Sequence, residues 1–274
     1  SGPLSIHPMF RKGAGISKIE ITSVISFGNI VTNILEELKY RLGECINRKT
    51  PTPVNLEDKP KEAAIFFRDQ ANIAKGPIDN LTKIAEEQGF IVVNTNFGNE
   101  SIDGFTMSDK NISYIFINSL KSSDRQRFTL AHEIGHNIMH EKPNSNMEKE
   151  ANDFASELLL PSEELKSEIG VDLNLYRLAE LKQKWKVSMA AILMAAGSRG
   201  YIEKNKSDYL WKELSARGFR RKEPSSLDFS VEKPSVVASL IEKFNKNFQK
   251  NILEDSFEVF GIEKNEFNRM LGMN

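Results

Sequence analysis

Three of the chain's four histidines lie within nine residues, in a stretch that ends at His140. The order His132-Glu133-x-x-His136 places two imidazoles four residues apart, with a glutamate directly after the first one. On an α-helix, which turns about 100° per residue, His132 and His136 lie about 40° apart on one face. Two imidazoles at this spacing can bind one divalent ion, usually Zn²⁺, while the neighbouring glutamate serves as a general base. The stretch therefore predicts a zinc-dependent hydrolytic site, against the alternative of a surface helix that carries these residues by chance.

A zinc site of this kind needs a third protein ligand, which the helix expected next, over residues 147–160, can supply. The intervening loop has only about six residues, so the two helices must lie close together. The acidic side chains on the second helix are Glu148, Glu150, Asp153 and Glu157. The last three share a face at i, i+3 and i+7, so geometry does not choose among them, and a solvated acidic face is the alternative. His140 is a weaker candidate, because three successive i+4 groups lie along a line rather than around a tetrahedron.

Composition limits the class of protein to which the chain can belong. The 274 residues include 37 basic and 38 acidic side chains, a balance that argues against a surface built wholly for nucleic acid. One cysteine, Cys45, excludes an internal disulfide and suits a reducing cytosol. No run reaches the roughly 18 apolar residues of a membrane span, and the first residues lack the pattern of a signal peptide. We therefore expect a soluble cytoplasmic protein.

The elements that must position the site follow from the spacing of apolar residues. One amphipathic helix is expected over 28–48, followed by a linker that contains two prolines. Further helices are expected over 61–73, 77–88 and 124–140, and short strands over 90–93, 104–107 and 114–118, with a hairpin turn at 108–111. The pattern predicts an α+β fold in which a small three-stranded antiparallel sheet packs on a helical metallopeptidase domain, followed by a C-terminal all-α tail.

Residues beyond the site raise the question of nucleic-acid binding. Helices expected over 175–186 and 189–196 form a helix-turn-helix, but the second one lacks the Arg, Gln and Asn that read bases. Residues 201–222 hold seven basic side chains against three acidic ones, which a solvated face that packs its aromatic residues inward explains better than a DNA-binding patch. We therefore expect no direct nucleic-acid binding. The predicted organisation is an N-terminal helical segment over 1–60, the metallopeptidase domain over 61–222 and a C-terminal helical region over 223–274.

Three segments together resemble the ImmA/IrrE family of metallopeptidases. They are Arg127–His136 (RFTLAHEIGH), Glu150–Ala155 (EANDFA) and Leu158–Pro161 (LLLP), and the resemblance covers roughly residues 61–220. It implies that His132, His136 and Glu150 hold zinc and that a sheet-plus-helix domain surrounds them. The catalytic base in this arrangement is Glu133.

The resemblance also implies a substrate, a DNA-binding repressor of the helix-turn-helix type. Its cleavage would relieve repression of phage, mobile-element, stress or defence genes. The alternative is a regulatory protein that binds and sequesters a repressor or antitoxin without cutting it. Residues 1–60 supply only one clear helix, so we expect the repressor to be a separate protein.

Overall fold

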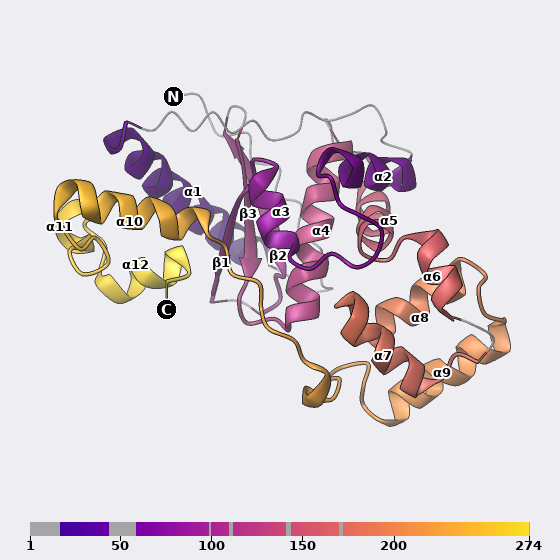
Figure 1. Ribbon diagram of the computed structural model, residues 1–274. Coiled ribbons are helices and arrows are strands. Elements are labelled where there is room, and N and C mark those ends of the chain that lie inside the picture. Colours follow the sequence, from indigo (N-terminus) through magenta and orange to yellow (C-terminus); the bar gives the residue numbers. More distant parts are fainter. Residues whose placement is uncertain are drawn as a thin grey trace. The chain divides into compact units, whose positions relative to one another are not determined.

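The computed structural model describes residues 17–43, 59–98, 100–109, 112–140, 144–169 and 172–273. The chain divides into two compact units (Figure 1). The first comprises the described parts of 1–52, 82–122 and 232–274, and the second comprises those of 53–81 and 123–231. This division differs from the three ranges expected from the sequence, because the residues of the sheet share a core with helices from both ends of the chain.

The first unit contains a three-stranded sheet formed by β1 (Ile91–Thr95), β2 (Gly104–Asp109) and β3 (Ile112–Asn118). The strand order is β1-β3-β2, with β2 antiparallel to β3 and β1 parallel to it. The α+β class is confirmed, but the prediction of an antiparallel sheet is wrong for β1. The chain between β1 and β2 passes to the far side of β3, so β3 occupies the centre and runs in the same direction as β1.

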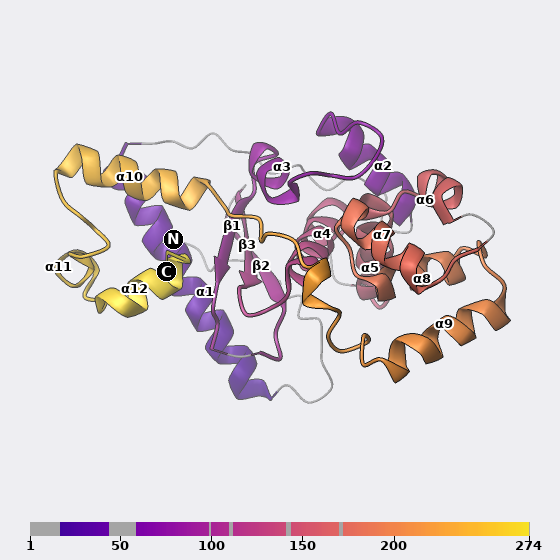
Figure 2. The ribbon, with the colours of Figure 1, turned by 60° about the horizontal axis from the view of Figure 1, so that its bottom comes forward.

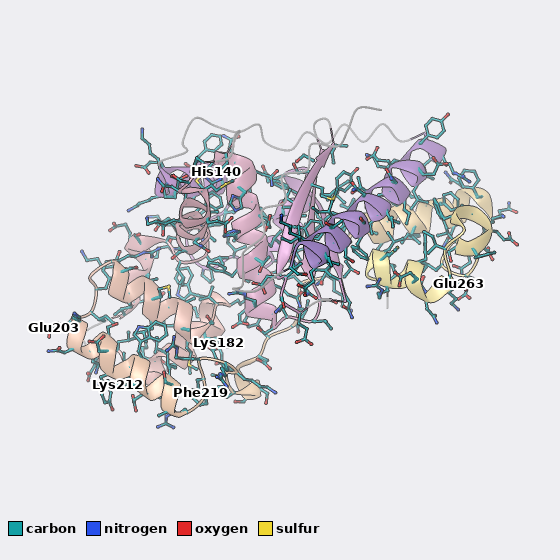
Figure 3. All side chains as sticks on the ribbon, turned by 180° about the vertical axis from the view of Figure 1, so that it is seen from behind. His140, Lys182, Glu203, Lys212, Phe219 and Glu263 are labelled. Atoms are coloured by element: carbon teal, nitrogen blue, oxygen red, sulfur yellow. The ribbon has the colours of Figure 1, made fainter. Side chains whose placement is uncertain are left out.

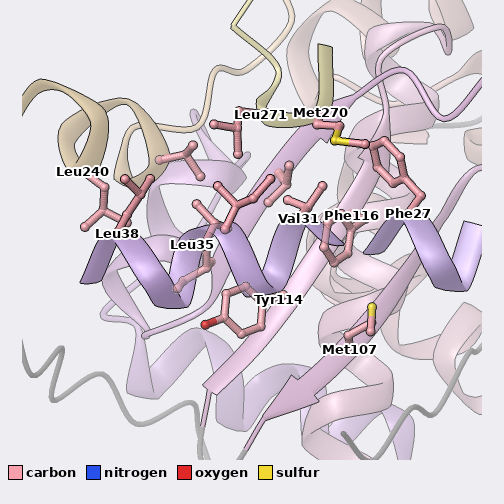
Figure 4. Packing of buried hydrophobic residues seen from close by; sticks show 14 of the residues in the cluster. Phe27, Val31, Leu35, Leu38, Met107, Tyr114, Phe116, Leu240, Met270 and Leu271 are labelled. Carbon is pink, nitrogen blue, oxygen red and sulfur yellow. The ribbon is translucent and has the colours of Figure 1, made fainter. Parts of the chain in front are cut away.

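Helix α1 (Lys18–Arg41) supplies much of the core of this unit. It begins ten residues before the expected helix, because Ser17 and Glu20 form a reciprocal capping box at its N-terminus. Residues 44–48 of the expected helix lie outside the described residues. Val31, Leu35 and Leu38 of α1 share one buried cluster with Tyr114 and Phe116 of β3, and Leu38 lies near Leu240 (Figure 4).

The helices of the expected C-terminal all-α tail are present, and they pack into the core of the first unit. They are α10 (Val236–Phe248), α11 (Ser256–Phe260) and α12 (Lys264–Leu271). Both α10 and α12 pack beside α1 and β1 (Figures 1 and 2). The carboxylate of Glu86, in α3 (Leu81–Glu87), accepts hydrogen bonds from the backbone N–H groups of Ser235 and Val236. Glu86 therefore satisfies donors at the start of α10 that no helical carbonyl can reach.

The second unit is helical in its described residues. Its helices are α2 (Pro60–Gln70), α4 (Ser123–Met139), α5 (Met147–Leu159), α6 (Ser162–Ile169), α7 (Leu175–Trp185), α8 (Met189–Ser198) and α9 (Lys204–Ala216), with a 3-10 turn at Ser225–Leu227. Helices α4 and α5 lie side by side, and α2 packs against both (Figure 1). The sequence did not predict α6, which is only two turns long, or α9, which buries only Leu210 and Leu214. In the part of the chain that the structure describes, no helix combines the length and the hydrophobicity needed to cross a bilayer.

A buried lysine connects α7 to the first turn of α4. The ammonium of Lys182 lies 3.0 Å from Asp124 Oδ2 and 2.8 Å from Glu223 Oε2, and all three side chains are buried or nearly so (Figure 3 labels Lys182). Burial alone would lower the pKa of Lys182, but the hydrogen bonds and charges of Glu223 and Asp124 outweigh burial and raise that pKa. The amine therefore stays charged and neutralises two carboxylates whose side chains are only about a tenth exposed.

Removal of this amine is expected to destabilise the fold strongly. In Lys182→Ala, two carboxylates remain buried without their cation, and we expect the free energy of unfolding to fall by about 3–5 kcal/mol. Urea unfolding followed by circular dichroism measures the change. Lys184→Ala is the matched control on the same helix. Lys184 is half exposed, where it pairs with Glu168 and lies 5.9 Å from the centre of the Trp185 ring, so its loss should cost no more than about 1 kcal/mol. Equal costs for the two variants would contradict the prediction.

Candidate metal centre

The site is built on α4, a helix that is buried on nearly all sides. His132, Glu133 and His136 are each no more than 2% exposed, although all three are polar. Polar side chains are costly to bury unless they bind a partner, and ionisable ones are costlier still. Their burial excludes the chance surface helix and indicates that these side chains serve a site inside the unit.

The two imidazoles of the motif converge on one point. His132 Nε2 and His136 Nε2 are 3.0 Å apart, and the rings meet edge to face at 84°. Two nitrogens bound to the same tetrahedral zinc at about 2.0–2.1 Å would be about 3.3 Å apart. The predicted pairing of these histidines is therefore present, with a separation close to that of a shared metal ion.

The carboxylate that joins the two imidazoles is that of Glu148, in the first turn of α5. Glu148 Oε1 is 3.4 Å from His136 Nε2, and Glu148 Oε2 is 3.7 Å from His132 Nε2. In the described ranges, these three residues form the one group of His, Cys, Asp or Glu whose candidate ligand atoms all lie within 4.8 Å of one another. Glu148 is about half exposed on the side chain, so this edge of the site is open to solvent.

The structure does not bring Glu150, the third ligand that the resemblance implied, to the two imidazoles. Its carboxylate Oε2 lies 2.9 Å from His140 Nε2 instead. Residues 148 and 150 are related by a rotation of about 200° around a helix, and their side chains contact different histidines. The group that the structure brings together thus contains Glu148 and not the predicted Glu150. Both are acids in the first turn of α5, and the sequence favoured Glu150 only through the resemblance of the segment that begins with it.

The other two acids of α5 have different partners. Asp153 pairs with Lys149 at 2.8 Å on an exposed part of the helix. Glu157 is buried, but it accepts hydrogen bonds from Ser162 and pairs with Arg199 at 3.0 Å. Neither lies in the group around the imidazoles, so none of the three acids that share a helix face, Glu150, Asp153 and Glu157, belongs to that group.

Burial also prepares His136 for a metal. It lowers the pKa of His136, and the neighbouring His140 lowers that pKa further. The carboxylate of Glu148 acts in the opposite direction, but it does not cancel the effect of burial. A lowered pKa keeps the imidazole neutral at neutral pH, and a metal ion binds only the neutral form. His132, His136 and Glu148 thus form a His₂Glu set whose chemistry suits zinc and leaves one coordination position for water.

A close approach of α4 and α5 holds these residues together. A Cβ atom added to Gly135 would lie 2.8 Å from Phe154 Cδ1, closer than real Cβ contacts, and 3.0 Å from Phe154 Cγ, which is also tight. Gly135 lies between the two imidazoles in sequence, and Phe154 is fully buried. The glycine therefore allows α5 to approach α4 closely enough for a first-turn glutamate to reach the imidazoles.

Gly135→Ala is expected to disturb this approach. The added methyl group must displace Phe154 or separate the helices, which should lower the free energy of unfolding by about 1–3 kcal/mol. Thermal unfolding measures the loss, and the double variant Gly135→Ala/Phe154→Leu should recover part of it. Gly197→Ala in α8 is the control, because the nearest atom there is the rotatable hydroxyl of Ser207 at 3.1 Å. A loss in Gly197→Ala as large as that in Gly135→Ala would refute the steric explanation.

Comparison with known proteins places this site within a recognised domain. Residues 85–196 match the Peptidase_M78 family model, described as the IrrE N-terminal-like domain. A protein named uncharacterized immunity region protein 2, from Bacillus phage phi105, is 35% identical over 104 residues. The aligned part covers 34% of this chain and 65% of the length of the phage protein. The matched residues include His132, Glu133, His136 and Glu148.

Proposed function

Since the chain carries an IrrE N-terminal-like domain over residues 85–196 and so belongs to the ImmA/IrrE family, we propose that it is a zinc-dependent endopeptidase. The observation that supports this activity best is the convergence of His132, His136 and Glu148 from two packed helices. A His₂Glu set is typical of catalytic zinc sites, whereas structural zinc sites use four protein ligands. The solvent-exposed edge at Glu148 provides a way in for a peptide.

The roles of the side chains follow from this arrangement. His132, His136 and Glu148 would hold zinc, which when bound supplies Lewis acidity that activates water and polarises a peptide carbonyl. Glu133 lies next to His132 but is turned about 100° away around α4, so it is not a ligand. Its buried carboxylate accepts a proton from the attacking water and then donates that proton to the amine that leaves.

The proposed substrate is a DNA-binding transcriptional repressor encoded near the same gene. Support comes from the name of the phage relative, which assigns that protein to an immunity region. Cleavage of the repressor would switch on phage, mobile-element, stress or defence genes. Because a repressor acts on DNA inside the cell, the peptidase would act in the cytoplasm.

The rival function is sequestration, in which the same surface binds a repressor or antitoxin and leaves it intact. The partly exposed Glu148 favours neither function, because a bound partner could also cover that edge. The two functions differ in the fate of the repressor, which a gel resolves directly.

The deciding experiment incubates the zinc-loaded protein with the purified product of the neighbouring repressor gene. We expect two fragments of defined mass, detected by gel electrophoresis and mass spectrometry, and no fragments when a chelator is present. Repressor DNA binding is followed in the same samples by gel shift. If DNA binding is lost while the repressor remains full-length, the peptidase proposal is wrong and sequestration is right.

A further inference from the structure

Two buried side chains next to the candidate metal centre have no role in the proposed chemistry. His140, at the end of α4, places Nδ1 3.1 Å from His136 Nδ1 (Figure 3 labels His140). Its other nitrogen, Nε2, lies 2.9 Å from Glu150 Oε2. The side chain of His140 is fully buried and that of Glu150 is 13% exposed, so water competes little for these contacts. The contacts form a continuous series from Glu150 through His140 to His136.

The chemistry of these groups assigns the hydrogens along the series. An ionised carboxylate only accepts hydrogen bonds, so Nε2 of His140 must carry the hydrogen that it donates to Glu150. The assignment takes His140 in its neutral form, in which the other nitrogen is an acceptor, so His140 Nδ1 accepts from His136 Nδ1. With its hydrogen on Nδ1, His136 carries its lone pair on Nε2. That atom is the one that faces His132 and Glu148.

We propose that His140 and Glu150 are positioning residues that hold His136 in the tautomer whose Nε2 lone pair is directed at the metal position. Metal-binding histidines commonly donate their second N–H to a carboxylate or carbonyl, which fixes both tautomer and ring orientation. Here His140 lies between the two, so that His136 contacts His140 and His140 contacts the carboxylate of Glu150. The proposal rests on the proposed function in one respect, namely that a metal ion binds at Nε2 of His136. The tautomer of His136 can be measured without that metal.

Three features of the structure support a positioning role over simple packing. Both nitrogens of His140 lie at hydrogen-bond distance from a partner, whereas packing alone requires no such match. The second contact joins α4 to α5, so it also fixes the rotation of the His140 ring. Asn144 Nδ2 lies 3.5 Å from the same Glu150 oxygen and helps to hold the carboxylate in place.

The first test reads the tautomer directly in the metal-free full chain. Long-range ¹H–¹⁵N NMR spectra distinguish the two neutral tautomers of each imidazole, and the chain has only four histidines to assign. We expect His136 to carry its hydrogen on Nδ1 in the wild type. In His140→Leu this preference should be lost, because no acceptor remains. In His140→Asn it should be retained, since the amide oxygen of asparagine can take the place of Nδ1.

The second test measures zinc affinity by competition with a chromophoric chelator. His140→Leu should bind zinc about 10–100-fold more weakly than the wild type, and His140→Asn should recover most of that loss. If His140→Leu does not fold, Glu150→Gln is the milder variant to measure. It is also expected to bind zinc more weakly than the wild type. Asp153→Ala is the control, because it removes a carboxylate from the same helix that pairs with Lys149 on an exposed part of α5. Its zinc affinity should equal that of the wild type.

These outcomes separate the inference from the function on which it rests. An unchanged His136 tautomer and unchanged zinc affinity in His140→Leu would overturn the positioning role and leave the peptidase proposal intact. A wild-type protein that binds no zinc would overturn the proposed function, while the NMR result still decides the tautomer. Loss of affinity that His140→Asn does not restore would indicate packing alone and would also overturn the inference.

Discussion

Repressor cleavage by Glu133→Gln is expected to be about 10²–10⁴-fold slower than cleavage by the wild type, the range for loss of a general acid–base group. Glutamine has nearly the shape of glutamate, so it should fit the buried position on α4 without disturbing the helix. It cannot accept a proton from water at neutral pH. Zinc content should stay at the wild-type level, because Glu133 lies outside the group that would bind the metal. A time course of fragment formation at saturating zinc measures the rate.

The control for this variant is Glu180→Gln, which makes the same chemical change in an exposed ion pair with Arg177 on α7. Its cleavage rate should equal that of the wild type. If Glu133→Gln cleaves the repressor as fast as Glu180→Gln does, Glu133 is not the base and the hydrolytic mechanism fails.

The second large effect concerns the two first-turn acids of α5. Glu148→Ala is expected to lose zinc during gel filtration, as His132→Ala does, because each removes one of the three grouped side chains. Glu150→Ala is expected to retain zinc with an affinity lowered by about 10–100-fold, because its carboxylate contacts His140 rather than the imidazole pair. Metal analysis of the eluted proteins, followed by chelator competition, measures both effects.

The pair is its own matched control, since both substitutions remove one carboxylate from the same helix turn. The reverse order, with zinc lost in Glu150→Ala and kept in Glu148→Ala, would show that the family resemblance identifies the ligand correctly and that the geometry of α5 does not. Equal retention of zinc in both variants would show that neither acid binds the metal.

The motif itself could be predicted from the sequence because it depends only on local geometry. His132 and His136 are four residues apart, and an α-helix places residues at that spacing on one face whatever surrounds them. The same locality explains why α4, α5 and α7 begin and end close to their expected positions, since caps, proline and apolar spacing act within a few residues. In contrast, α1 starts earlier than expected because its apolar spacing is irregular near Ser17 and the capping box decides the boundary.

The strand arrangement and the composition of the two units could not be predicted in this way. The direction of β1 relative to β3 depends on where the chain between β1 and β2 crosses the sheet, and short apolar strands carry no signal for that crossing. Likewise, α1 and α10 pack together although about 200 residues of sequence separate them, because each buries an apolar face that the other covers.

By itself, the sequence determined the chemistry that the chain can perform: two imidazoles and a neighbouring glutamate on one helix, with several acids on the next. Only the tertiary structure decided which acid joins them. That choice depends on how α5 is rotated and on how closely it approaches α4, and the missing side chain of Gly135 leaves the room that Phe154 occupies in this approach. Glu148 and Glu150 have the same chemistry, and a rotation of about 200° around the axis of α5 separates them. Which of the two faces the imidazoles is decided only when α5 packs against α4.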